Sequence, residues 1–254
     1  MIKVLVNGAL GRMGRTVCAA VNADSELELV GAVDVLEGTV EGLQVATNLD
    51  AALKSLSPDV MVDFTRPAVV FDNVMTALAN KVSPVVGTTG LSDDAKEQIR
   101  RRAEEMDTPA FIAPNFALGA VLMMLAAQRI AKFMPDVEII ELHHDNKLDA
   151  PSGTAELTAK MIAQVRPPHK QGHPDEVERL AHVRGADVDG IRIHSVRLPG
   201  YVAHQEVIFG GLGQTLTIRH DSTGRDSFMP GVVLACKKVR GLKGLTIGLD
   251  KLLD

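Results

Sequence analysis

Two histidines and a lysine lie close together in one polar segment of this 254-residue chain. His143 and His144 end a predicted strand, and Lys147 follows shortly after them. Imidazole exchanges protons near neutral pH, and a lysine cation holds a carboxylate or donates a proton. The sequence Pro151-Ser152-Gly153-Thr154 then opens a predicted helix, whose first N–H groups attract anions. The segment therefore predicts proton transfer to a small acid with more than one carboxylate.

Each of these residues also has a simpler explanation. A lone histidine is more often structural than catalytic, and Ser152 and Thr154 could only cap the helix. Neighbouring residues of a strand point to opposite faces, so His143 and His144 are not expected to share a metal ion, and no metal site is predicted. Because both histidines, Lys147 and the start of a helix occur in one loop, a catalytic role is favoured over these structural explanations.

A glycine-rich turn, Asn7-Gly-Ala-Leu-Gly-Arg-Met-Gly14, joins the first predicted strand to the first predicted helix. Glycines here let the backbone approach a pyrophosphate, although Leu10 replaces the second glycine of the usual dinucleotide fingerprint. Asp34 ends the second strand, 20 residues after Gly14, where a carboxylate accepts hydrogen bonds from a ribose. The alternative is a tight turn that binds nothing. The order of strand, turn, helix, strand and acid favours a dinucleotide site.

The residues around Asp34 bear on the choice of cofactor. Val35 follows it, and no arginine stands there to meet a 2′-phosphate, which favours NADH. Arg12 or Arg15 could still contact such a phosphate, so both NADH and NADPH are predicted cofactors. Two further turns follow later strands, at residues 63–67 and 87–90, and could lie against a nicotinamide or a ribose. Residues 113–116 lead out of the domain and are predicted to form a hinge.

The pattern of apolar residues predicts an α/β fold. Short apolar runs alternate with helical spacing up to Pro114, which predicts a Rossmann-type, doubly wound parallel sheet. The expected strands are 3–7, 29–34, 59–64, 84–87 and 110–113, and the expected helices are 12–21, 68–80 and 93–106.

The pattern changes after Pro114, where an inserted α+β domain with a mixed or mostly antiparallel sheet is expected. The expected elements are helices at 118–132 and 153–165, a strand ending at 143–144, a long loop at 166–190, and strands at 191–198, 204–209 and 214–220. A helix at 229–239 and a strand at 245–249 are expected to close the chain.

Composition and charge narrow the class of protein. The net charge of −5 disfavours a nucleic-acid partner, and the arginines at 100–102 share a predicted helix with Glu104 and Glu105, which indicates a solvated face. Cys18 and Cys236 are too far apart in the sequence to suggest a metal site or a disulfide framework, which favours a cytoplasmic location. No signal segment or membrane partner is predicted, because the longest apolar run, 116–127, is too short to cross a bilayer.

The segment Glu141-Leu-His-His-x-x-Lys-x-Asp-Ala-Pro-Ser-Gly-Thr-Ala155 resembles the signature of the 4-hydroxy-tetrahydrodipicolinate (dihydrodipicolinate) reductases. The motifs at residues 8–14, 63–65, 87–90 and 114–116 resemble other blocks of that family, in the same order. The resemblance implies reduction of a cyclic dicarboxylate by NADH or NADPH on the diaminopimelate route to lysine, with tetrahydrodipicolinate as the product.

The resemblance also implies roles for particular residues. His143 would be the proton donor or acceptor, Lys147 a second proton donor, and Ser152 part of the substrate-binding turn. His144, Lys147, Gly153 and Thr154 would bind the substrate carboxylates. Residues that would bind the cofactor are Gly8, Ala9, Leu10, Gly11, Arg12, Met13, Asp34, Arg66, Gly87, Thr88, Thr89, Ala113, Pro114, Asn115 and Phe116.

The same family resemblance implies a domain arrangement and an oligomer. Residues 1–114 and 225–254 would form the dinucleotide-binding domain, and residues 115–224 the substrate-binding and oligomerisation domain. The substrate would bind in the cleft between them, and a homotetramer would form through the sheet of the second domain.

Two other functions are compatible with the sequence. Another two-domain NAD-dependent dehydrogenase, acting on a small amino acid such as aspartate, would explain the nucleotide domain but not the whole segment 141–155. A non-catalytic NAD(H) sensor would bind the cofactor and need no proton donor.

Overall fold

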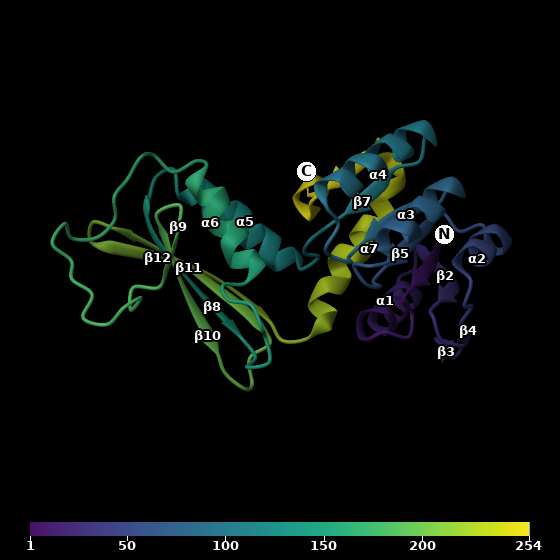
Figure 1. Cartoon of the computed structure of the whole chain (residues 1–254), viewed down its shortest axis with the longest axis horizontal. Helices are drawn as coiled ribbons and strands as arrows, with labels where there is room; N and C mark the ends of the chain where they lie inside the picture. Colours follow the sequence, from purple (N-terminus) through teal and green to yellow (C-terminus); the bar gives the residue numbers. More distant parts are fainter. Residues whose placement is uncertain (254) are drawn as a thin grey trace. The chain divides into compact units, whose positions relative to one another are not determined.

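The computed structural model describes residues 1–253, which divide into two compact units. The first unit comprises residues 1–118 and 225 onwards, and the second comprises residues 119–224 (Figure 1). Within residues 1–253, no helix is both long and apolar enough to span a membrane.

A six-stranded parallel sheet forms the centre of the first unit. Its strands are β1 (Ile2–Asn7), β2 (Leu27–Val33), β5 (Val60–Asp63), β6 (Ser83–Val86), β7 (Ala110–Ile112) and β13 (Leu245–Ile247). They lie in the order β13-β7-β6-β5-β1-β2. The chain leaves β1 for β2 on one side and returns to β5 on the other, so the sheet has a topological switch point between β1 and β5. Open α/β sheets bind ligands at such a point, beyond the carboxyl ends of the strands.

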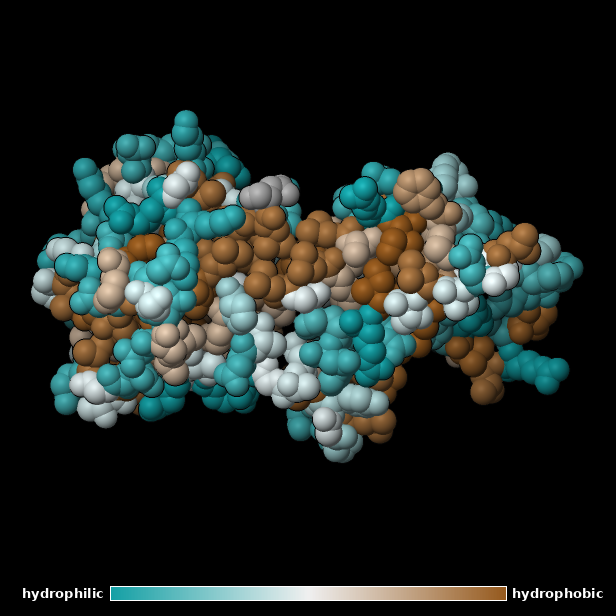
Figure 2. Space-filling model, turned by 180° about the vertical axis from the view of Figure 1, so that it is seen from behind, coloured by the Kyte–Doolittle hydropathy of each residue, from teal (hydrophilic) through white to brown (hydrophobic). Residues whose placement is uncertain are grey.

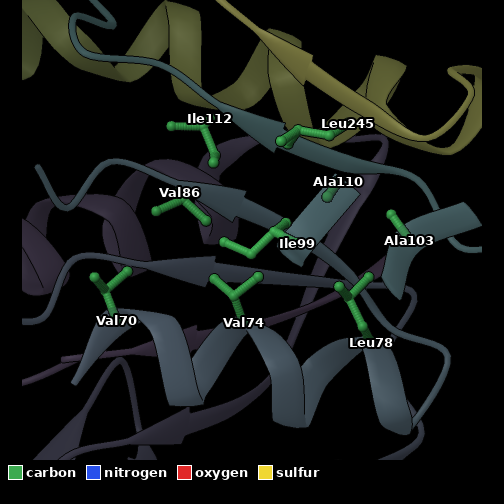
Figure 3. Packing of buried hydrophobic residues seen from close by; sticks show 9 residues of the cluster. All are labelled: Val70, Val74, Leu78, Val86, Ile99, Ala103, Ala110, Ile112 and Leu245. Carbon is green, nitrogen blue, oxygen red and sulfur yellow. The ribbon is translucent and has the colours of Figure 1, made fainter. Parts of the chain in front are cut away.

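Helices cover this sheet and complete the doubly wound arrangement (Figure 1). They are α1 (Arg12–Ala23), α2 (Leu49–Leu56), α3 (Val70–Ala79), α4 (Asp93–Glu105) and α7 (Met229–Lys238), with short 3₁₀ turns at 225–228, 239–241 and 249–252. Val70, Val74 and Leu78 repeat every fourth residue, so α3 turns one apolar stripe onto the sheet (Figure 3).

Leu245 joins the same buried cluster although it comes from β13, near the end of the chain (Figure 3). The other members are Val70, Val74, Leu78, Val86, Ile99, Ala103, Ala110 and Ile112. Because Leu245 is 6% exposed and its strand pairs with β7 in parallel, the C-terminal segment is part of the core of the first unit.

The second unit contains a five-stranded mixed sheet. Its strands are β8 (Asp136–His143), β9 (Ala186–Val188), β10 (Ile191–Arg197), β11 (Ala203–Gly211) and β12 (Gln214–Ser222), in the order β12-β11-β8-β10-β9. The central strand β8 pairs in parallel with β10 and antiparallel with β11. Helices α5 (Leu118–Ile130) and α6 (Gly153–Ala163) lie beside this sheet (Figure 1). The predicted fold class, a Rossmann-type sheet with a second mixed sheet, is confirmed.

Two local expectations need correction. The segment 166–190 was expected to be a loop throughout, but β9 occupies residues 186–188. This three-residue strand pairs only with β10 and has no buried residue, so it leaves no alternating apolar pattern in the sequence. Between Asp34 and Asp59 no element was predicted, yet α2 and a small hairpin, β3 (Thr39–Val40) and β4 (Leu43–Gln44), lie there. Only Ala52 and Leu53 of α2 are buried, which is too short an apolar stripe to recognise.

Candidate active site

The glycine turn after β1 is possible only with glycine at two of its positions. Gly8 has a φ of +81°, and a Cβ there would come within 2.6 Å of the Phe64 carbonyl oxygen. A Cβ on Gly14 would come within 2.0 Å of the Gly8 carbonyl oxygen. The first glycine therefore lets the turn approach β5, and the last lets α1 pack against the turn.

The N-terminus of α1 is built to receive an anion. Gly11 is its N-cap and offers no side-chain hydrogen bond, and the first helical bond runs from the Arg15 N–H to the Gly11 carbonyl. The N–H groups of Arg12 and Met13 therefore have no carbonyl partner within the helix. Together with the helix dipole, such groups bind phosphate, so this turn fits the pyrophosphate of a dinucleotide.

Asp34 lies beside the same turn, at the end of β2. Its Oδ2 accepts a hydrogen bond of 2.8 Å from the Leu10 N–H, and its Oδ1 accepts one of 2.7 Å from the Val35 N–H. The carboxylate is thereby held at the edge of a cavity of about 540 Å³. Predicted cofactor residues on this cavity are Gly8, Leu10, Gly11, Asp34 and Arg66. Val35 and Leu36, also on its lining, are 86% and 67% exposed and give the cavity an apolar edge.

Asp63, at the end of β5, joins the strand ends around this cavity. Its carboxylate is fully buried and accepts hydrogen bonds from the side chains of Asn7, Thr65, Asn73 and Thr88, at 2.7–2.9 Å. A buried carboxylate is costly unless such donors satisfy it. Because Asn7 ends β1, while Thr65 and Thr88 come after β5 and β6, Asp63 holds three strand ends in one arrangement, with Asn73 of α3 as a fourth donor.

The other predicted cofactor residues fall into three groups. Ala9, Ala113 and Phe116 are almost fully buried, so their side chains pack inside the unit. The Phe116 ring packs 5.8 Å from Phe64 and 6.0 Å from Phe111 between ring centroids. The residues with exposed or half-buried side chains are Arg12, Met13, Thr89, Pro114 and Asn115. Gly87 packs against the Phe64 ring, and Thr88 is bound to Asp63.

His143 is the last residue of β8, in the second unit. Its side chain is 14% exposed, and its Nδ1 makes a short hydrogen bond to Oε2 of Glu141, two residues earlier on the same face of the strand. Arg197 ends the neighbouring parallel strand β10, directly opposite His143. Its two terminal nitrogens bind both oxygens of Glu141, at 2.9 and 2.8 Å.

Glu141 is fully buried and yet ionised. Burial acts to raise its pKa, but hydrogen bonds from His143, Arg197 and Ser195 outweigh that effect and lower the pKa to about 2. The sheet therefore carries a fixed negative charge directly against the His143 ring.

Lys147 is held by a carboxylate of its own. Its Nζ lies 2.7 and 2.8 Å from the two oxygens of Asp149, and this contact lowers the pKa of the Asp149 carboxyl. The Lys147 side chain is 19% exposed and that of Asp149 is 64% exposed. His144 is exposed. An incoming carboxylate can therefore compete with Asp149 for the lysine.

The helix after this loop begins as expected. Ser152 is 3% exposed, and its Oγ accepts the Ala155 N–H at 3.2 Å, so it caps α6. Gly153 is exposed, and a Cβ there would meet no atom within 4 Å. Thr154 is half-buried, and its carbonyl accepts a hydrogen bond from Thr158. The start of α6 thus presents an open backbone surface at Gly153.

Three residues of these sites were assigned no role from the sequence. Glu141 stands at the start of the family signature but received no role of its own. Its spacing of two residues from His143 was the available signal, because it places both side chains on one face of the strand. Asp63 was only part of a turn. Arg197 had no signal at all, because its contact with Glu141 depends on the register between β10 and β8.

Comparisons with known proteins agree along the whole chain. The family profile described as dihydrodipicolinate reductase, N-terminus, matches residues 2–116, and its C-terminus counterpart matches residues 119–253. Proteins named 4-hydroxy-tetrahydrodipicolinate reductase from Desulfitobacterium hafniense and Halalkalibacterium halodurans are each 52% identical over this entire chain and 99–100% of their own length. A dipicolinate-bound dihydrodipicolinate reductase from Paenisporosarcina sp. TG-14 superposes with a TM-score of 0.93 and 47% identity, covering both chains completely.

The lowered pKa of Glu141 predicts an acid sensitivity. A carboxyl with a folded pKa near 2 and an unfolded pKa near 4.5 contributes stability above about pH 4.5 and loses it as the pH falls toward 2. The size is on the order of 3 kcal/mol. In Glu141→Gln, the melting temperature should be lower at pH 7, and the difference from wild type should shrink between pH 4.5 and 2. A constant difference across that range would contradict the assignment.

Proposed function

The chain belongs to the dihydrodipicolinate reductase family, and on this premise we propose which residues carry out its reaction. The chain reduces 4-hydroxy-tetrahydrodipicolinate to tetrahydrodipicolinate in the diaminopimelate route to lysine, with a nicotinamide nucleotide as the reductant. The balanced reaction takes up one hydride and one proton and releases water. No finding favours a dehydrogenase for aspartate or a non-catalytic sensor.

The nicotinamide nucleotide, when bound, supplies the hydride. In the proposal, the N–H groups of Arg12 and Met13 hold its pyrophosphate, and Asp34 holds the adenosine ribose. The turns at 65–66, 87–89 and 113–116 surround the remainder of the cofactor. The observations that support this are the uncapped start of α1 and the cavity that Asp34 borders.

His143 supplies the proton in this proposal, and Lys147 is the second proton donor. His144, Lys147 and the turn of Ser152, Gly153 and Thr154 hold the carboxylates of the substrate. The observation that carries these roles is that His143 ends β8, that Lys147 lies in the loop after it, and that each is bound to a carboxylate. The dipicolinate bound to the Paenisporosarcina relative is a planar dicarboxylate of the same kind. Residues 115–224 are proposed as the substrate-binding domain, and residues 1–114 with 225–254 as the nucleotide domain.

Removing either proton donor should lower turnover. His143→Ala and Lys147→Ala should each reduce kcat by roughly 10²- to 10⁴-fold, with the KM for NADH little changed. The assay is oxidation of NADH at 340 nm with substrate generated from pyruvate and aspartate semialdehyde by the preceding synthase. Lys160→Ala is the matched control, because Lys160 lies on the exposed side of α6 and pairs with Glu156. Wild-type kinetics in both variants would refute the proposed roles.

Asp34 is proposed to favour NADH over NADPH, because a carboxylate accepts ribose hydroxyls and repels a 2′-phosphate. Asp34→Asn keeps the shape and removes the charge. The ratio of kcat/KM for NADPH to that for NADH should rise by about tenfold. Asp72→Asn, on an exposed part of α3, is the control. An unchanged ratio would remove Asp34 from the selection of cofactor.

A homotetramer through the sheet of the second unit is proposed as well. One face of that sheet packs Val137 and Ile139 in the core, while Ile140, Leu142 and Ile208 on the opposite face stay partly exposed. Partly exposed apolar side chains such as these three mark protein contacts. The face of the molecule shown in Figure 2 carries areas of apolar as well as polar surface.

Sedimentation equilibrium tests the tetramer. Wild type should sediment at about four times 27.2 kDa, and Ile140→Lys should shift it toward the monomer, because a charge on an interface lacks a partner. Leu212→Lys, at the fully exposed hairpin tip, should leave the mass unchanged. A monomeric wild type would end the proposal.

The cytoplasmic location stays a prediction.

A further inference from the structure

We propose that Glu141 and Arg197 form a fixed ion pair that positions His143 for proton transfer. The inference rests on the role of His143 proposed above. Neither residue is placed against the substrate, so both are positioning residues and not catalytic ones. Their effect would act through the orientation and charge of the His143 ring.

The geometry of Glu141 suits this role. It shares one face of β8 with His143, and its Oε2 engages Nδ1 of that ring. With Nδ1 committed to the carboxylate, Nε2 is the nitrogen left to exchange a proton with a substrate. The Glu141 carboxylate also places a negative charge next to the ring that is proposed to give up the proton.

Arg197 keeps the carboxylate from turning. Its bidentate contact uses both Glu141 oxygens, and a fork of this kind fixes orientation as well as charge. One terminal nitrogen also donates to the Val196 carbonyl at 2.8 Å. The guanidinium is therefore anchored to its own strand, β10, while it holds the acid on β8.

Arg197 also reaches the loop that carries Lys147. Its Nη2 donates to the Asp149 carbonyl oxygen at 2.8 Å, and the Asp149 carboxylate binds Lys147. The same guanidinium thus connects the strand of His143 to the loop of Lys147. This double connection argues for a role beyond packing, since a purely structural ion pair would not need to contact the loop.

The dependence of kcat on pH tests the proposal in the intact enzyme. Glu141→Gln should lower kcat by about tenfold or more and shift the alkaline limb of the profile by about one unit, because Nδ1 of the ring loses its carboxylate partner. The KM values should change less than threefold. Glu105→Gln is the control, because Glu105 is an exposed carboxylate on α4 of the first unit and pairs with Arg102. Its profile should match wild type.

A second readout does not depend on how well Glu141→Gln folds. Nitrogen-15 NMR of histidine-labelled wild type, with His143→Ala to assign the signal, should show the neutral His143 ring protonated at Nδ1. Arg197→Lys, which keeps the charge, should retain more turnover than Arg197→Met. A ring protonated at Nε2, or an unshifted profile in a folded Glu141→Gln, would overturn the inference.

The outcomes separate this inference from the proposed function. If His143→Ala retains wild-type turnover, the role of His143 fails and the positioning role fails with it. If His143→Ala loses turnover while Glu141→Gln keeps the wild-type profile, only the positioning role is wrong.

Discussion

Both units of this protein depend on the same constraint, that a carboxylate removed from water must be satisfied by donors from other elements. Asp63 meets it with neutral side chains from three strand ends and a helix. Glu141 meets it with a histidine and a bidentate arginine. Because leaving such a group unpaired costs several kcal/mol, the surrounding turns cannot rearrange independently. Each buried carboxylate thus sets the geometry of the candidate site residues around it.

The buried carboxylates of Asp63 and Glu141 have different effects because their hydrogen-bond donors differ. The donors of Asp63 are amides and hydroxyls, which hold the turns around the cofactor cavity without adding charge. Glu141 faces two groups that can be cationic, so it supplies charge as well as orientation to His143. In both places the candidate residues lie at the carboxyl ends of parallel strands, where side chains and helix starts converge.

The local features of both sites could be predicted from the sequence, since each depends on neighbouring residues. The spacing of Gly8, Gly11 and Gly14 predicted the strand-to-helix turn, and Ser152 was expected as the cap of α6, which the structure confirms. Short elements without an apolar pattern, α2 and β9, were missed. The partners of the buried acids could not be predicted, because Asn7 and Asp63, and likewise Glu141 and Arg197, lie 56 residues apart.

By itself, the sequence determined the fold class, the family and the residue types available for chemistry, because periodicity and short motifs are local properties of a chain. Only the tertiary structure decided which side chains those residues meet. The register between β8 and β10 places Arg197 opposite His143, and the order of β1, β5 and β6 brings Asn7 and Thr88 to Asp63. Such contacts arise from the pairing of strands that are far apart in the sequence, and a shift of one residue would turn each of these side chains to the other face.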